Sequence, residues 1–134
     1  MKKYESVLKF IKYEVNEINY KKNEKFMMDK EGTSIDFKIT PIISVKEKNM
    51  SVELVVDVFE NALENNKPFE MKVHLTGYFI TKGENPEIFK ANAIAILYPY
   101  VRAIVSTYTA NANITPLILP AINVNKLIED QKKN

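Results

Sequence analysis

The side chains with catalytic potential are few and widely separated in this sequence. His74 is the only histidine, cysteine is absent and there are three glycines. His74 alternates out of phase with the apolar Val73 and Leu75, which predicts a place on the polar face of a strand. A serine or threonine nucleophile would need a positioned base, and no second histidine can serve. The glycines are too dispersed to form a phosphate-binding loop.

The carboxylates are dispersed as well, at strand positions that the apolar alternation assigns to solvent. They are Glu14, Glu17, Glu53, Asp57 and Glu70. Solvated strand faces explain them better than a general acid–base pair does. No cluster of ligand-type residues surrounds His74 to hold zinc. We therefore predict a protein that is not an enzyme, with no catalytic residues, no metal and no cofactor.

Length and charge are those of an ordinary globular protein. The chain has 134 residues, of which 46% are hydrophobic and 27% charged, and its net charge is +2. This length predicts a single domain over residues 1–134. So small a charge, carried by scattered lysines, argues against a nucleic-acid partner. The absence of cysteine excludes disulfides and fits a reducing compartment.

Two features bear on membranes and export. The N-terminus begins with lysines, like a signal peptide, but Tyr4 and Glu5 follow and no apolar segment develops. We therefore predict a cytoplasmic protein. No charged residue lies between Arg102 and Lys126, but asparagines and prolines interrupt this stretch, which argues against a membrane span. Its apolar side chains must be divided among core, subunit interface and an exposed binding surface.

The first two thirds of the chain have the period of β-strands. Apolar residues alternate with polar ones over 11–15, and the alternation changes parity before Ile18 and Tyr20. A bulge or a change of facing surface near Asn16-Glu17 would explain this change.

Three further alternating segments cover residues 35–45, 52–58 and 69–79. Pro41 marks an edge, bulge or bend in the first of them. Residues 21–33 form a polar loop with an apolar tag in its middle. Short connections favour an antiparallel meander with one apolar face.

A helix follows that can cover this face. Asn85-Pro86-Glu87 is a good helix start, and apolar residues recur at helical spacing as far as Tyr108. Pro99 predicts a kink or the start of a second helix. Two prolines exclude a regular helix over 114–123, and 124–132 is a short amphipathic helix. The fold class is α+β: a four-stranded antiparallel, meander-like sheet with a long, kinked helix and a short C-terminal helix on one side.

Two runs near the C-terminus resemble segments of SecB, the bacterial preprotein-export chaperone. Leu97-Tyr98-Pro99-Tyr100-Val101-Arg102 is similar to the family's Leu-Phe-Pro-Tyr-Ala-Arg signature. Leu117-Ile118-Leu119-Pro120-Ala121-Ile122-Asn123-Val124 resembles its Leu-Asn-Leu-Ala-Pro-Val-Asn-Phe segment, at matching spacing. Gly77-Tyr78-Phe79 resembles the end of the family's fourth strand, and residues 13–20 resemble its first strand. The resemblance covers residues 8 to 130.

This resemblance implies an ATP-independent holdase related to preprotein export. Family members are homotetramers, dimers of dimers, that bind unfolded or nascent polypeptides in apolar surface grooves without cofactor or nucleotide hydrolysis. The family's groove carries over to Phe26, Met27, Met28, Ile35, Phe37, Ile39, Val124, Leu127 and Ile128. Ile35, Phe37 and Leu127 could equally be plain core. The family's dimer–dimer interface carries over to Tyr100, Ile104, Val105 and Tyr108, which could be shared with the sheet.

The face that docks the export motor SecA in this family departs from its usual charge. Glu17 is retained, but Lys21 and Lys72 stand where acids are usual. Two charge reversals would turn attraction into repulsion. The chain is also weakly basic and ends without an acidic tail. The sequence thus suggests a divergent member without the usual handover to SecA, such as a chaperone dedicated to one client, for example an antitoxin.

Two other classes of protein remain open on the sequence alone. One is a dedicated interaction module, a subunit that uses the same surfaces for one partner. The other is a small-ligand carrier or hot-dog-like enzyme, because a helix on an antiparallel sheet can enclose an apolar pocket. Suppressed aggregation of unrelated proteins, a single bound partner, or a copurifying small molecule would distinguish the three classes.

Overall fold

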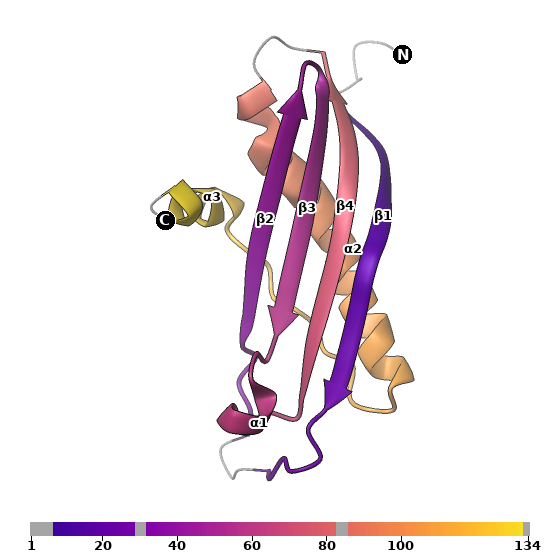
Figure 1. Ribbon diagram of the computed structural model, residues 1–134, viewed down its shortest axis with the longest axis vertical. Helices are drawn as coiled ribbons and strands as arrows, with labels where there is room; N and C mark the ends of the chain where they lie inside the picture. The colour runs from indigo at the N-terminus through magenta and orange to yellow at the C-terminus, as the bar shows by residue number, and fades with distance from the viewer. Residues whose placement is uncertain (1–6, 29–31, 83–85, 133–134) are drawn as a thin grey trace.

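A computed structural model describes residues 7–28, 32–82 and 86–132 of the chain. The described elements are β1 (Leu8–Lys22), β2 (Phe37–Lys46), β3 (Asn49–Val58), α1 (Ala62–Asn65), β4 (Phe69–Thr81), η2 (Pro86–Phe89), α2 (Lys90–Asn111) and α3 (Val124–Lys132). The strands form one antiparallel sheet, and α2 runs along a single face of it (Figure 1). The α+β class predicted from the periodicity is confirmed.

The strand order is β1-β4-β3-β2, so the meander holds only for β2, β3 and β4. The segment between β1 and β2 is long enough to cross the end of the sheet, and it places β1 beside β4 instead of β2. This is the order of a Greek key. It leaves two edge strands, β1 and β2, so of the edge, bulge or bend that Pro41 indicated, the structure shows the edge.

The change of parity in β1 is a bulge, as predicted. The pairing of β1 with β4 shifts between Val15 and Glu17, so Asn16 has no partner in the register. The Thr76 hydroxyl donates a hydrogen bond to Asn16 Oδ1 over 2.7 Å. A second shift, which the periodicity did not indicate, leaves out Ile11.

The core lies between α2 and the inner face of the sheet. The fully buried side chains that meet there include Val52, Leu54, Val56, Val73, Leu75, Phe79, Ile94, Leu97, Val101 and Val105. Gly77 permits a close approach, because a Cβ atom built there would lie 2.8 Å from Leu97 Cδ1. A side chain at this position of β4 would therefore collide with α2.

The helix differs from its predicted form at two points. Pro86–Phe89 is a 3₁₀ turn and the α-helix begins at Lys90, while Asn85 lies outside the described residues. Since α2 is one element through Pro99, no second helix starts there. By length and apolar content alone Pro86–Asn111 could cross a membrane. In this fold its apolar face packs on the sheet, so it is the core helix.

The two runs that resemble SecB segments contact each other. Tyr98 and Arg102 come from the first run, on α2, and both side chains bind backbone of the second. The Tyr98 hydroxyl donates to the Pro120 carbonyl oxygen over 2.6 Å, and Arg102 Nε donates to the Leu119 carbonyl oxygen over 2.9 Å. With Leu119 fully buried, these contacts fix the connector between α2 and α3 against the helix.

Candidate functional site

A large apolar hollow lies at the end of the sheet where β1 finishes and β4 begins. We call it the end pocket; it is open to solvent and has a volume of about 1030 Å³. One wall is the segment after β1 and the other is the connector after α2. The apolar lining consists of Tyr20, Phe26, Met28, Ile35, Phe59, Phe69, Pro116, Ile114 and Leu117.

An aromatic cluster forms the inner end of this pocket. The ring centroids of Tyr20 and Phe69 are 5.2 Å apart, and Phe59 meets Phe69 edge to face at 5.2 Å. Tyr20 and Phe69 are placed there by their strands, while Phe59 follows β3. Desolvation raises the pKa of the Tyr20 phenol, with a smaller contribution from Tyr108. The surface is thus apolar and its rings have defined positions.

The connector wall is tied to the last turn of α2. Asn113 adopts the left-handed conformation (φ 63°), which lets the chain turn back after the helix. The Leu117 amide then donates to Thr109 Oγ1 over 2.8 Å, and the Thr109 hydroxyl donates to the Val105 carbonyl oxygen over 2.8 Å. This wall is therefore set by hydrogen bonds from a fully buried threonine.

Asn23 ties the start of the opposite wall to the turn before β4. Its backbone amide donates to Pro68, and its side-chain amide donates to the carbonyl oxygens of Lys67 and Ala62, at 2.9 and 3.1 Å. Asn23 Oδ1 accepts from the Lys25 amide over 3.0 Å. The chain that forms this wall therefore leaves β1 in one defined direction, because hydrogen bonds with the buried Asn23 hold four backbone groups.

The residues predicted for the groove fall into two separate regions. Phe26, Met28 and Ile35 line the end pocket, and Met27 is exposed beside it. The others pack partly buried against the core: Phe37, Ile39, Val124, Leu127 and Ile128. On α3, Gln131 Nε2 donates to the Pro41 carbonyl oxygen over 3.0 Å, which holds this helix at the edge of β2.

The aromatic cluster and the connector wall are not among the residues predicted for the groove. Tyr20 and Phe69 fit the alternation of their strands, and nothing in that spacing shows that their rings meet, or that Phe59 joins them, at the end of the sheet. For Ile114 and Leu117 a signal was present: they belong to the charge-free stretch that exceeds what the core needs.

A second apolar surface runs along the free edge of β1. We call it the β1 strip; its exposed members are Ile11, Tyr13, Val15 and Ile18. Tyr100 of α2 lies beside it, with its ring centroid 4.4 Å from that of Tyr13. Ile104 is half-buried and Tyr108 exposed on the same helix. Val105, predicted with them, is fully buried in the core of this chain.

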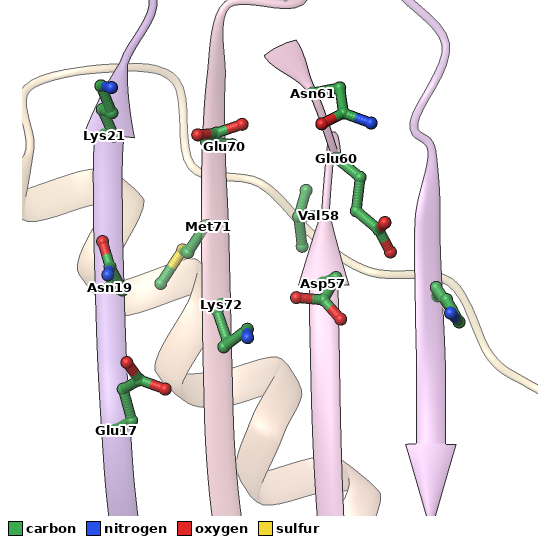
Figure 2. A pocket seen from close by; sticks show the side chains of 11 residues that line it. Glu17, Asn19, Lys21, Asp57, Val58, Glu60, Asn61, Glu70, Met71 and Lys72 are labelled. Atoms are coloured by element: carbon green, nitrogen blue, oxygen red, sulfur yellow. The ribbon is translucent and has the colours of Figure 1, made fainter.

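The outer face of the sheet carries mixed charge. Figure 2 shows Glu17, Lys21 and Lys72 around a polar hollow of about 460 Å³ near one end of the sheet. Lys21 is paired in register with Glu70, and Lys72 with Asp57. Each lysine therefore stands opposite an acid, and the face carries side chains of both charges.

The single histidine lies on the same outer face, as predicted. His74 Nε2 is 2.9 Å from Glu53 Oε1, and both side chains are partly exposed. In the described parts of the chain, no three His, Asp or Glu side chains are grouped to hold a metal ion.

Sequence comparison places this chain in a known family. The profile described as "Preprotein translocase subunit SecB" matches residues 14–134. An uncharacterized protein of Methanocaldococcus jannaschii, MJ0357, is 34% identical over 123 residues, which cover 88% of this chain and 76% of that protein. The chain belongs to the SecB family of chaperones. These are not enzymes, and the prediction of a non-enzymatic protein is confirmed.

Solved structures share the fold. The SecB-like chaperone Rv1957 of Mycobacterium tuberculosis, in complex with a ChAD peptide from the HigA1 antitoxin, superposes with a TM-score of 0.67. The two sequences are 14% identical, and the superposition covers 87% of this chain and 91% of the Rv1957 chain. A protein of unknown function from Streptococcus agalactiae has a TM-score of 0.52 at 17% identity, over 85% and 97% of the two chains.

Proposed function

We propose that this protein is a cytoplasmic, ATP-independent holdase that binds non-native polypeptides in the end pocket. The observation that carries the proposal is the pocket itself: an open apolar hollow, lined by aromatic rings, on a member of a chaperone family. Burying unfolded apolar side chains there gains free energy without demanding a particular sequence. The exposed Met28 suits varied clients, because an unbranched thioether adapts to many shapes.

The proposed assembly is a homotetramer built as a dimer of dimers. The β1 strip supports this, because a long exposed apolar edge strand pairs readily with another chain. Tyr100, Ile104 and Tyr108 would extend the contact along α2. Val105 supports the core of its own subunit instead.

The proposed handover differs from the usual export route. Because Lys21 and Lys72 each face an acid, the outer face offers SecA a surface of mixed charge instead of a uniformly acidic one. A dedicated partner is the alternative: a chaperone for one client, or an interaction module. The fold shared with a SecB-like chaperone that binds an antitoxin peptide supports this alternative.

The test dilutes two unrelated, chemically unfolded proteins into buffer and follows their aggregation by light scattering. The general holdase keeps both soluble at near-stoichiometric ratio. The pocket variant is Met28→Asp and its matched control is Met27→Asp, since both methionines are highly exposed (83% and 75%) and only Met28 lines the pocket. We expect protection to fall in the first variant and to persist in the second.

The other outcomes separate the alternatives. If neither protein is protected, but one partner copurifies from the native cell, the dedicated chaperone or module replaces the general holdase. If a small molecule copurifies instead, the pocket is a carrier site. Equal loss in both variants would contradict the assignment of binding to the end pocket.

A further inference from the structure

The Asn66 side chain lies outside the end pocket and binds the backbone of the pocket wall that follows β1. Asn66 Nδ2 donates to the Met27 carbonyl oxygen over 2.9 Å, and the Met27 amide donates to Asn66 Oδ1 over 2.9 Å. The asparagine amide thus binds both backbone groups of Met27, as a neighbouring strand would. The two residues are 39 positions apart, so this contact joins the pocket wall formed by the segment after β1 to the end of α1.

The conformation of Asn66 makes this contact possible. Asn66 ends α1 in the left-handed region, with φ 51° and ψ 56°, where glycine and asparagine are the tolerated residues. A glycine would satisfy the turn equally well, but it could not reach Met27. Asparagine at this position therefore does more than end the helix.

The consequence falls on the neighbours of Met27. Phe26 and Met28 line the end pocket, whereas Met27 between them does not. Met28 is 83% exposed, so it has little packing of its own to hold it in place. Its position depends on the backbone that Asn66 binds.

We propose that Asn66 is a positioning residue for client binding: it holds the Met27 backbone so that Phe26 and Met28 form a wall of the end pocket. This inference rests on the proposed function, since a wall matters only if a polypeptide binds against it. Prior ordering of the wall lowers the entropy cost of binding.

The test is a double-mutant cycle between Asn66→Gly and Met28→Ala. The probe is a fluorescently labelled, reduced and carboxamidomethylated test protein that stays unfolded, and its affinity is measured by anisotropy. Asn65→Ala is the matched control, because Asn65 Nδ2 also makes an exposed hydrogen bond, to the Glu60 carbonyl oxygen at 3.0 Å, away from the pocket. A second readout is amide hydrogen exchange at Met27. It reports the two hydrogen bonds between Asn66 and the Met27 backbone, which we call the clamp, in the absence of any client.

We expect Asn66→Gly to weaken probe binding about three- to tenfold in the natural background, because two solvent-exposed hydrogen bonds are lost. In the Met28→Ala background the same change should alter affinity less, because Met28, one of the two side chains that Asn66 positions, has been truncated. Exchange at Met27 should accelerate in Asn66→Gly and stay unchanged in Asn65→Ala.

Two results overturn the inference. An equal loss in both backgrounds, or none in the natural one, means that Asn66 does not act through Met28. If the unsubstituted protein binds no probe while exchange at Met27 still responds to Asn66→Gly, the clamp exists and the proposed function fails, and the positioning role fails with it.

Discussion

Replacing Tyr98 with phenylalanine tests whether side chains of α2 hold the connector that forms one wall of the end pocket. Tyr98 is only 5% exposed, and its hydroxyl donates to the Pro120 carbonyl oxygen over 2.6 Å. The substitution keeps the ring and removes only the donor. Losing such a bond costs about 1–2 kcal/mol, which for a chain of this length lowers Tm by about 3–6 °C.

The alkaline pH dependence of stability gives a second readout. Burial raises the pKa of the Tyr98 phenol above its ordinary 10.0, against a smaller lowering by Arg102. Because the folded-state pKa is the higher one, the contribution to stability is complete below pH 10.0 and is lost as the pH rises through the folded pKa. A phenylalanine cannot ionise, so Tyr98→Phe should lose less stability than the natural protein between about pH 9 and 11.

The assay is urea unfolding followed by circular dichroism at neutral and alkaline pH. Tyr78→Phe, on the outer face of the sheet opposite Ser51, is the matched control. Client affinity should also fall in Tyr98→Phe, because Leu117 of the pocket wall lies only three residues before Pro120. Unchanged stability at neutral pH, or the same alkaline loss in the variant and the natural protein, would refute this account of the connector.

The remaining predictions concern packing, assembly and docking. Gly77→Ala should destabilise by about 1–3 kcal/mol in thermal unfolding, since its Cβ would lie 2.8 Å from Leu97 Cδ1; a neutral effect contradicts the close approach. Val15→Lys should convert tetramers to smaller species in light-scattering chromatography, and an unchanged mass excludes the β1 strip as an interface. Lys21→Glu with Lys72→Glu should create SecA binding detectable by pull-down; tight binding by the natural protein would contradict the proposed charge block.

The fold could be predicted largely from periodicity. Four alternating segments and one long helical pattern appear in the sequence, and the parity change before Ile18 located the bulge at Asn16. Strand order was less predictable, because period 2 says which face a residue occupies and not which strand lies beside it. The segment between β1 and β2 is long, and in the structure β1 lies next to β4 and not next to β2.

For the candidate site as well, the sequence indicated some features and the tertiary structure decided others. The sequence by itself indicated that the charge-free stretch is divided among core, interface and binding surface, that Met28 lies in an apolar tag within a polar loop, and that Lys21 and Lys72 stand where acids are usual in the family. Only the tertiary structure decided where the apolar residues lie: Val105 is buried in the core, while Tyr20, Phe69 and Leu117 meet at one end of the sheet and line the end pocket. The reason is physical: burial depends on which elements pack together in the folded chain, and the local hydrophobic period gives only the face of an element on which a residue lies.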